Sequence, residues 1–510
     1  MDTTGGEEST FQYRMAYIAG IVDDMRASGE YDDVLLIDDG DIYQGSPVSN
    51  MTDGAAMRAC LELMHYDAVV LGNHEFDWGL EVTAQTDGTL APYAFGEYSG
   101  DPSIPILACN LYEAGTNTRS GFTRDYTVVE KAGHRIVLIG YIPDFSAEIM
   151  RSRIAPYTID PDFAKFKARI REIQEAEDPD ITIVTAHELP AGVANALDPE
   201  DVDLVTGGHR HQGIYGIADS GIPYLQADCN AQGYASAVIR IDGEGNAAVE
   251  DPMYTGITDE PERLYDTPEN AENFDPQILA LSHAAWDEIR DQMAEYLGYI
   301  DSSIQKKGFI DGPTTTGGNF LTGLMLEYMR DYGVVAAFYN RSGFRTDIIV
   351  PEGGTMPVTV GDIYAINPFN NTWLVFDLTG EELAQQLVNG FAETNFGDQV
   401  SGLTYEFYDH GTDEEPDIEI VSITLSDGTS VDIHGTEPIY RVCTSNYGAT
   451  LEGGVFEGKT PVYPEADAPI DNEALIELLR ARRDRGEEHI PTDNAPRGFC
   501  LDADGTKAAA

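Results

Sequence analysis

The stretch Gly72-Asn73-His74-Glu75-Phe76-Asp77 directly follows an apolar run, Ala68-Val69-Val70-Leu71. A short continuous apolar run of this kind is typical of a strand that is buried on both faces. The strand would therefore end in an amide, an imidazole and two carboxylates. Because open α/β folds place their chemistry at the carboxyl ends of strands, this stretch predicts an α/β domain with a polar site at that edge.

Other strand-like runs end in the same way, in side chains suited to divalent metals. Carboxylate oxygen, amide oxygen and imidazole nitrogen form the ligand set expected for Zn, Mn, Fe or Ca, and not for copper or iron–sulfur centres. Taken singly, each such residue is more often a polar or packed side chain. Their recurrence at successive strand ends predicts a metal site with preorganised ligands. The groups are Asp41 after residues 34–37, Asn73 and His74 after 68–71, His187 after 181–186, and His209 and His211 after 203–206.

Strand-like and helix-like segments alternate up to about residue 250, which predicts a layered α/β core. Residues 251–275 are rich in Pro, Asp and Glu and indicate a connector, and residues 276–298 have helical periodicity. A second unit begins near residue 305. We therefore expect a catalytic domain over 1–250, a linker with a connecting helix over 251–304, a second domain over 305–498 and a tail over 499–510.

The composition limits the classes of partner. The chain has 510 residues, 42% apolar content and a formal net charge of −59, with only seven lysines. A diffuse acidic surface argues against duplex nucleic acid or an anionic membrane as a partner, and any phosphate site needs local arginine or metal charge. The five cysteines form no CxxC pair. No run approaches the ~18 apolar residues of a transmembrane helix, and the first residues lack the features of a signal peptide.

The motifs carry a resemblance. Gly40-Asp41, the stretch 72–77, His187 and Gly207-Gly208-His209-x-His211 resemble the calcineurin-like metallophosphoesterases. More closely, the chain resembles the two-domain 5′-nucleotidase and 2′,3′-cyclic-nucleotide phosphodiesterase family. The resemblance implies a four-layer α/β/β/α metallophosphoesterase sandwich followed by a smaller C-terminal α/β nucleotide-binding domain. It also implies hydrolysis of nucleotides or related phosphoesters, and an extracytoplasmic location (secreted, periplasmic or cell surface).

The resemblance further implies two divalent metal ions, Zn, Mn or similar. Asp41 would bridge the two ions, and His211 would bind one of them. The other ion would be completed by Asn73, His187 and His209. Two ions about 3.5–4 Å apart can clamp a phosphate and activate water. His74, oriented by Asp77, would instead stabilise the developing charge or protonate the leaving oxygen.

The second half carries its own matches. Residues 339–345 resemble the family's Asn-x-Gly-Gly-x-Arg element, residues 367–371 its Pro-Phe-x-Asn element, and residues 444–447 its Asn-aromatic element. In the family two aromatic rings hold the base, and stacking of this kind is worth ~1–3 kcal/mol per base. The alternative is that both aromatic residues, Phe369 and Tyr447, pack in the core of the domain. The implied substrate-binding residues are Asn340, Arg345, Phe369, Asn371 and Tyr447, with Asn110 as a weaker candidate for a phosphate contact.

The sequence departs from the family pattern in two places. The family begins with a strand ending in Asp-x-His, which this sequence lacks, so the resemblance implies one incomplete metal site. We expect a start assigned too late in the gene; trimming and genuine loss of activity are the alternatives. Gly453-Gly454-Val455 and Tyr447 resemble the cyclic phosphodiesterase and 3′-nucleotidase branch more than the 5′-nucleotidase branch. The rival functions are a phosphatase for non-nucleotide esters and a catalytically silent nucleotide-binding or surface protein.

Overall fold

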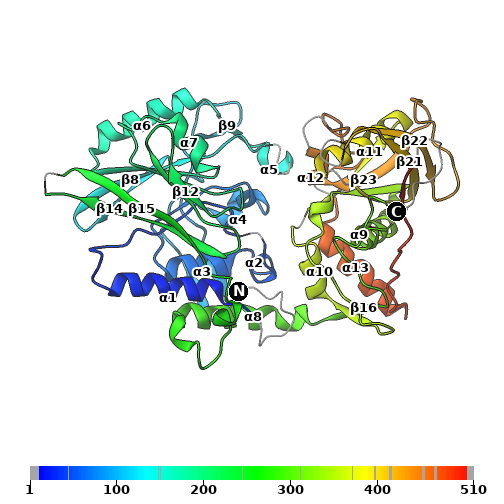
Figure 1. Cartoon of the computed structure of the whole chain (residues 1–510), viewed down its shortest axis with the longest axis horizontal. Coiled ribbons are helices and arrows are strands. Elements are labelled where there is room, and N and C mark those ends of the chain that lie inside the picture. Colours follow the sequence, from blue (N-terminus) through cyan, green and yellow to red (C-terminus); the bar gives the residue numbers. More distant parts are fainter. Residues whose placement is uncertain are drawn as a thin grey trace. The chain divides into compact units, whose positions relative to one another are not determined.

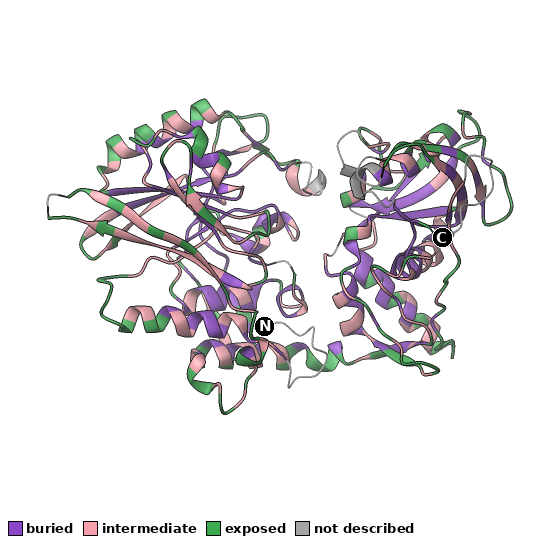
Figure 2. Cartoon of the chain, in the orientation of Figure 1, coloured by how far each residue is buried: buried purple, intermediate pink, exposed green. Residues whose placement is uncertain are grey.

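The computed structural model describes residues 11–43, 45–146, 149, 151–243, 245–310, 312–369, 371–394, 398–412, 416–450, 454–464 and 468–501. The chain divides into two compact units, Met1–Arg290 and Asp291–Ala510 (Figure 1). Buried side chains concentrate on the strands and on the inward faces of the helices within each unit (Figure 2). Among the described residues, no helix is both long and apolar enough to cross a membrane.

The first unit is built on two sheets. One has the order β1-β2-β5, and the other has the order β12-β13-β11-β10-β8-β7. Neighbours β1, β2 and β5 are parallel, as are β8, β10, β11 and β13, so the carboxyl ends of these strands share an edge within each sheet. The strands are β1 (Ile37–Asp38), β2 (Ala68–Val70), β5 (Ile106–Leu107), β7 (Tyr126–Lys131), β8 (His134–Tyr141), β10 (Ile181–Ala186), β11 (Leu204–Gly207), β12 (Ile214–Ile217) and β13 (Pro223–Gln226).

Shorter pairs complete the first unit's strands. The long antiparallel pair β14–β15 packs its apolar side chains against the same interior as the two sheets. The remaining pairs are β3 with β4 and β6 with β9. Their bounds are β3 (Tyr93–Phe95), β4 (Tyr98–Gly100), β6 (Leu111–Glu113), β9 (Tyr157–Ile159), β14 (Gly233–Ile241) and β15 (Ala247–Gly256).

Side-chain alternation along the strands makes the layers. In β8, Ile136 and Leu138 face the interior between the sheets, whereas Val137 and Ile139 face α6 and α7. Helix α6 begins where the Asp162 side chain accepts hydrogen bonds from Ala164 N and Lys165 N, as an N-cap does. The unit's helices are α1 (Arg14–Ala27), α2 (Pro47–Asn50), α3 (Ala55–Leu63), α4 (Leu80–Thr83), α5 (Arg151–Ile154), α6 (Phe163–Glu177), α7 (Pro190–Ala196) and α8 (Pro276–Met293, whose last three residues belong to the second unit). Helices therefore cover the outer faces of two facing sheets, which confirms the predicted α/β/β/α layering (Figure 1).

The second unit is a smaller α/β domain. A four-stranded sheet, β19-β23-β17-β20, packs with α11 and with the three-stranded sheet β22-β21-β24 around one apolar core. The strands are β16 (Tyr296–Ile300), β17 (Ala336–Tyr339), β18 (Met356–Thr359), β19 (Trp373–Leu378), β20 (Gln399–Ser401), β21 (Leu403–Asp409), β22 (Ile418–Leu425), β23 (Tyr440–Ser445) and β24 (Gly498–Cys500). The helices are α9 (Thr316–Tyr328), α10 (Val360–Ile366), α11 (Gly380–Thr394), α12 (Asn446–Thr450) and α13 (Asp471–Asp484).

Three details differ from the sequence-based expectations. The helix predicted for 276–298 ends at Met293, because Tyr296–Ile300 pairs with β18 as a strand. The connector predicted from 251 starts later, since β15 continues to Gly256 against β14. Residues 499 and 500, expected in the tail, belong to β24, which pairs in parallel with β21. In each case, pairing with another strand set the boundary.

Candidate functional site

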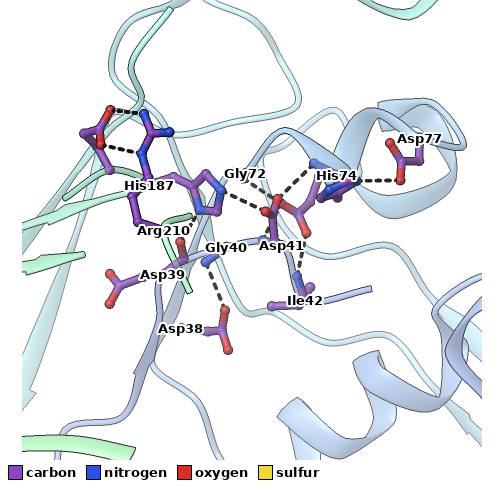
Figure 3. A network of polar contacts seen from close by, with 12 residues as sticks. Asp38, Asp39, Gly40, Asp41, Ile42, Gly72, His74, Asp77, His187 and Arg210 are labelled. Atoms are coloured by element: carbon purple, nitrogen blue, oxygen red, sulfur yellow. Dashed lines mark hydrogen bonds and ion pairs between the residues drawn. The ribbon is translucent and has the colours of Figure 1, made fainter. Parts of the chain in front are cut away.

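Four of the predicted ligands come from the carboxyl ends of strands in the two sheets. Asp41 lies three residues after β1, Asn73 three after β2, His187 directly after β10 and His209 two after β11. The structure brings three of them together: one ligand atom each from Asp41, His187 and His209 lies within 4.8 Å of the other two (Figure 3 shows Asp41 and His187). The three residues are separated by up to 168 positions in the sequence (209 − 41), so only the tertiary structure brings them together.

His187 is held in one orientation. Its Nδ1 atom lies 2.6 Å from the carbonyl oxygen of Asp39, so Nδ1–H donates there. Its Nε2 atom lies 3.0 Å from Asp41 Oδ2, and the whole side chain is buried. A ring fixed at one nitrogen by a carbonyl presents the other nitrogen as a ligand atom, which is the usual arrangement at metal-binding histidines.

The backbone around the cluster adopts conformations that few side chains tolerate. Asp41 and His209 have φ values of 60° and 70°. Non-glycine residues with positive φ store strain, and such strain is frequent at functional sites. A Cβ at Gly72 would lie 2.2 Å from Asp41 Oδ1, and one at Gly208 would lie 2.7 Å from the Asp39 carbonyl. The glycines of both motifs therefore allow the close approach of loop backbone to the ligands.

Glu75 is a functional candidate that the sequence argument missed. Its carboxylate is fully buried and accepts hydrogen bonds from the backbone N–H groups of Gly72, Asp41 and Ile42. Burial raises its pKa to about 7, with the Asp41 charge acting in the same direction. Glu75 thus joins the loop after β1 to the loop after β2. The only sequence signal was its place inside the 72–77 stretch.

Asp39 joins the two sheets. Its Oδ1 atom accepts hydrogen bonds from Thr185 Oγ1 at 2.7 Å and from Thr206 Oγ1 at 2.6 Å, one from β10 and one from β11. Burial raises the pKa of Asp39 to about 6, while the two threonine hydrogen bonds oppose the rise. Burial likewise raises the pKa of Asp38 to about 8. The positions of Asp41 and His187 therefore depend on a carboxylate that is not itself grouped with the ligands.

His74 forms a separate polar pair beside the cluster. Its Nδ1 atom lies 2.8 Å from Asp77 Oδ2, and its backbone N–H donates to Asp41 Oδ1 at 2.9 Å (Figure 3). Although burial opposes the charged ring, the Asp77 and Asp41 charges raise the His74 pKa to about 10. Asp41 also experiences desolvation, but the positive charges of His187 and His74 hold its pKa well below the usual range.

The residues present fit a divalent metal ion. Asn73 is buried, and its Oδ1 atom has no hydrogen-bond partner in the described structure. Leaving a buried amide oxygen unsatisfied costs roughly 1–3 kcal/mol, so a cation is a natural partner for it. The Asp41 carboxylate and the His187 and His209 imidazoles lie together and are donors suited to Zn or Mn, whereas Asn73 as a further ligand stays a prediction.

Two other predicted residues lie differently. His211 is exposed, has a φ of 49° and does not belong to the group of three. The Asn110 side chain donates to the carbonyls of Ile142 and Asp160 and accepts from Ile142 N. In this position Asn110 fixes loops of the first unit. Its predicted contact with phosphate remains a prediction.

The predicted substrate-binding residues of the second unit lie on segments that follow its strands and helices, apart from Tyr447, which lies in α12. Asn340 follows β17 and donates from Nδ2 to Ser342 Oγ at 2.7 Å. The Arg345 guanidinium lies over the Phe369 ring, 5.1 Å from the centroid. Tyr447, in α12, is 36% exposed. The structure thus brings Arg345 and Phe369 into contact, as expected for parts of one site.

A buried network supports these loops. The Tyr339 hydroxyl lies 2.9 Å from Asn367 Oδ1 and 3.0 Å from Asp471 Oδ2, within hydrogen-bond distance of both. Asp471 N donates to the Asn371 carbonyl at 2.7 Å. Burial raises the pKa of Asp471 to about 7, against its hydrogen bonds. Tyr339 and Asp471 were not among the expected functional residues, and their link depends on tertiary pairing.

Comparisons with known proteins agree with this division. A calcineurin-like phosphoesterase domain matches residues 11–213, and a 5′-nucleotidase C-terminal domain matches residues 303–458. Solved structures share the fold. One is the 5′-nucleotidase precursor of Thermus thermophilus, with a TM-score of 0.67, 22% identity and coverage of 96% of this chain and 93% of that chain. A putative 5′-nucleotidase from Staphylococcus aureus gives a TM-score of 0.69 at 18% identity, with 94% of each chain covered.

Several curated relatives are much longer than this chain. The trifunctional nucleotide phosphoesterase YfkN of Bacillus subtilis (strain 168) is 24% identical over 92% of this chain, which spans 34% of YfkN. The endonuclease YhcR of the same organism is 24% identical, with 94% of this chain and 38% of YhcR covered. The protein UshA of Escherichia coli (strain K12) is 25% identical, with 86% of this chain and 82% of UshA covered. The chain thus spans much less than two thirds of several relatives.

Proposed function

The chain belongs to the 5′-nucleotidase family, with a calcineurin-like metallophosphoesterase domain followed by a 5′-nucleotidase C-terminal domain, and from this we propose that it hydrolyses phosphoesters of nucleotides. The observation that carries the proposal is the convergence of Asp41, His187 and His209 beside the His74–Asp77 pair. Nucleotides are proposed as substrates because Arg345 and Phe369 combine a cation and an aromatic ring in the second unit. Cleavage could occur at a 5′, 3′ or 2′,3′-cyclic phosphate.

Each residue of the first unit has a proposed task. Asp41, Asn73, His187 and His209 hold divalent metal, with His211 as the further ligand implied by the family resemblance. When bound, the metal supplies positive charge for the phosphate oxygens and lowers the pKa of water. Asp39 and Glu75 keep the ligand loops in place through the threonine and backbone hydrogen bonds described above.

His74 has a different task in the proposal. Because Nδ1–H is committed to Asp77, the task would fall to the other ring nitrogen, Nε2. When Nε2 is protonated as well, a histidine held at Nδ1 by a carboxylate can donate the Nε2 proton to the leaving oxygen or form a hydrogen bond to the phosphate. Its backbone N–H, bonded to Asp41, keeps the imidazole close to the ligands without making it one of them.

An extracytoplasmic location is part of the proposal. It rests on the family resemblance and on one relative, the cell wall protein Lmo0130 of Listeria monocytogenes, which is 26% identical over 82% of this chain and of which the chain covers 56%.

A substrate panel tests the proposal. The full chain, with added Mn²⁺ or Zn²⁺, is assayed for phosphate release from AMP, 3′-AMP, 2′,3′-cyclic AMP, UDP-glucose and p-nitrophenyl phosphate. We expect turnover of at least one nucleotide, abolished by a chelator and restored by metal. Turnover of p-nitrophenyl phosphate alone would favour a phosphatase for non-nucleotide esters. No turnover of any ester, with nucleotide binding retained, would identify a silent binding protein.

A further inference from the structure

Residues 208–213, named here the histidine loop, join β11 to β12 and carry two of the predicted metal ligands. Those ligands, His209 and His211, have φ values of 70° and 49°. A non-glycine residue in this left-handed region is strained, and it persists only where the surrounding structure fixes it. A six-residue loop with two such residues therefore needs anchors on neighbouring elements.

The residues before, between and after the two histidines are each bonded to another segment of the first unit. Gly208 N–H donates to the Glu188 carbonyl at 3.3 Å. The Arg210 guanidinium donates from Nε to Glu188 Oε1 at 3.2 Å and from Nη2 to Oε2 at 3.3 Å (Figure 3 shows Arg210). The Gln212 carbonyl accepts a hydrogen bond from Gln226 Nε2 at 2.8 Å. Anchored positions therefore alternate with the two histidines along the loop.

Glu188 ties the histidine loop to another ligand segment. It directly follows His187, which comes after β10, and its Oε1 atom also accepts the Leu189 N–H at 2.7 Å. A guanidinium that meets a carboxylate through two hydrogen bonds fixes the direction of the pair as well as its distance. The pair thus joins the backbones that carry His187 and His209, whose ring centroids lie 5.0 Å apart.

Gln226 lies between the two ends of the histidine loop. It is the last residue of β13, and its register partners are Gly207, just before the loop, and Ile214, just after it. The side chain is 1% exposed, and among the described residues its Oε1 atom has no hydrogen-bond partner. An apolar side chain of this size would avoid burying that oxygen. The bond from Nε2 to the Gln212 carbonyl is therefore what the buried amide provides.

We propose that Glu188 and Gln226 are positioning residues that hold the histidine loop in the conformation that presents its imidazoles to a divalent ion. The inference rests on the proposed function, because it takes this loop to bind metal. Neither residue touches the ion in the proposal: Glu188 acts through Gly208 and Arg210, and Gln226 acts through Gln212. Replacing residues that orient metal ligands typically costs about 10- to 100-fold in metal affinity or activity.

Calorimetric titration of Zn²⁺ into the metal-free full chain, at fixed ionic strength, tests the inference. Gln226→Met keeps nearly the same side-chain length and removes both the donor and the oxygen without a partner. Denaturant melts of this metal-free variant should therefore match the wild type, while its Kd for Zn²⁺ should rise about tenfold. Glu188→Gln should raise the Kd about threefold, because a partly exposed ion pair is weaker.

A double-mutant cycle isolates the ion pair. If Glu188 acts through Arg210, then Glu188→Gln, Arg210→Gln and the double variant should all raise the Kd by the same factor. Additive losses in the double variant would mean that the two residues act separately, and would overturn the role assigned to the Glu188 side chain.

Two matched controls come from the same unit and lie outside the segments that carry predicted ligands. Gln174 Nε2 donates to the Asp201 carbonyl at 2.8 Å, and Arg240 pairs with Glu250 at 2.9 Å. Gln174→Met and Arg240→Gln should leave the Kd for Zn²⁺ within about twofold of wild type. A rise in the Kd as large as in Gln226→Met would mean that any lost bond weakens the site, and would overturn the inference.

Hydrogen exchange of the metal-free chain gives a readout that needs no ion. Gln226→Met and Glu188→Gln should speed exchange about tenfold at the backbone N–H groups of residues 208–213, because local opening becomes easier. Exchange in β11 should stay at the wild-type rate, and Gln174→Met should change neither segment.

The outcomes separate this inference from the proposed function. If the wild-type chain binds Zn²⁺ and hydrolyses nucleotides, but Gln226→Met and Glu188→Gln bind Zn²⁺ equally well, the inference is wrong and the proposed function stands. If the wild-type chain binds no ion, the proposed function fails and hydrogen exchange decides. Unchanged exchange at residues 208–213 then overturns the anchoring, whereas faster exchange confined to those residues supports it.

Discussion

The strand-end cluster of the first unit (Asp41, Asn73, His187 and His209) and the basic cluster of the second unit (Lys306, Lys307, Arg341 and Arg345) are built in opposite ways. In the first, two ligand groups are buried and two are half-buried, and they are held by the half-buried Asp39 and the buried Glu75. In the second, the cations are half-buried or exposed, and the two guanidinium groups lie over aromatic rings. Rigid strand ends suit groups that must keep a fixed geometry, whereas loops suit recognition of varied substrates.

The difference has an electrostatic side. The chain carries 89 acidic and 30 basic residues, so most of its surface would repel a phosphate ester. The strand-end cluster needs metal charge to attract such an ester, because its own groups include a carboxylate. The basic cluster needs no added ion. The predictions below test whether the first unit carries out the chemistry and the second unit recognises the substrate.

The largest effect is expected from Asp41→Asn. The change removes the carboxylate that joins the ligand group while leaving its size nearly constant. Turnover of nucleotides and of p-nitrophenyl phosphate should both fall at least about 10³-fold, since metal-assisted activation is lost. Asp53→Asn is the control, because Asp53 is exposed and also has a positive φ, 48°. Equal losses in both variants would mean that the effect is not specific to the carboxylate of the ligand group.

His74→Ala should have the next largest effect. Loss of a positioned proton donor typically costs about 10²- to 10⁴-fold in turnover, and we expect about 10²-fold here. Metal content, measured by elemental analysis, should stay near the wild-type value, because His74 is proposed not to be a ligand. Asp77→Asn should act in the same direction but more weakly, through the ring orientation. Loss of metal in His74→Ala would place this histidine among the ligands.

The control for that pair is a histidine and aspartate on the surface of the same unit. His134 Nδ1 lies 3.5 Å from Asp180 Oδ2, and both side chains are well exposed. His134→Ala should leave kcat and metal content unchanged. A comparable fall in kcat in this variant would indicate a general effect of removing histidines.

Phe369→Ala tests the second unit's part in recognition. Stacking of a base is worth roughly 1–3 kcal/mol, so kcat/KM for nucleotides should fall about 10-fold or more. The value for p-nitrophenyl phosphate should change less than about threefold. Tyr463→Ala, at an aromatic residue of the same unit that is 36% exposed, is the control. Equal losses for both kinds of substrate would assign Phe369 to packing.

The smallest effect is expected on stability, at Asp471. Because the pKa of Asp471 is raised from 3.8 to about 7, its contribution to stability is full below about pH 3.8 and is lost as the pH rises through about 7. As the pH rises from 4 to 8, the free energy of unfolding of Asp471→Asn should therefore increase relative to that of the wild type, by about 1–2 kcal/mol. Denaturant melts at the two pH values measure this. Asp484→Asn, near the exposed end of the same helix, should show no such pH dependence.

Much of the first unit could be predicted from sequence. The predicted strands at 68–71, 136–139, 181–184 and 203–206 correspond to β2, β8, β10 and β11, because continuous apolar runs bounded by polar turns have few other solutions. The two-domain α/β fold and the family were also correct. Element ends were harder, as at Met293, Gly256 and Cys500, where strand pairing decided the outcome.

The sequence by itself determined which groups are available for chemistry: a carboxylate, an amide and histidines, each placed after an apolar strand. Only the tertiary structure decided how they are held. Asp39 acquires its role from Thr185 and Thr206, which lie 146 and 167 positions away, and Lys306 meets Arg345 through a bridge between Ile304 and Ile348. The local sequence pattern indicates which residues of each segment are buried and which are exposed. Pairing between distant segments follows from the packing of whole sheets, which no single stretch encodes.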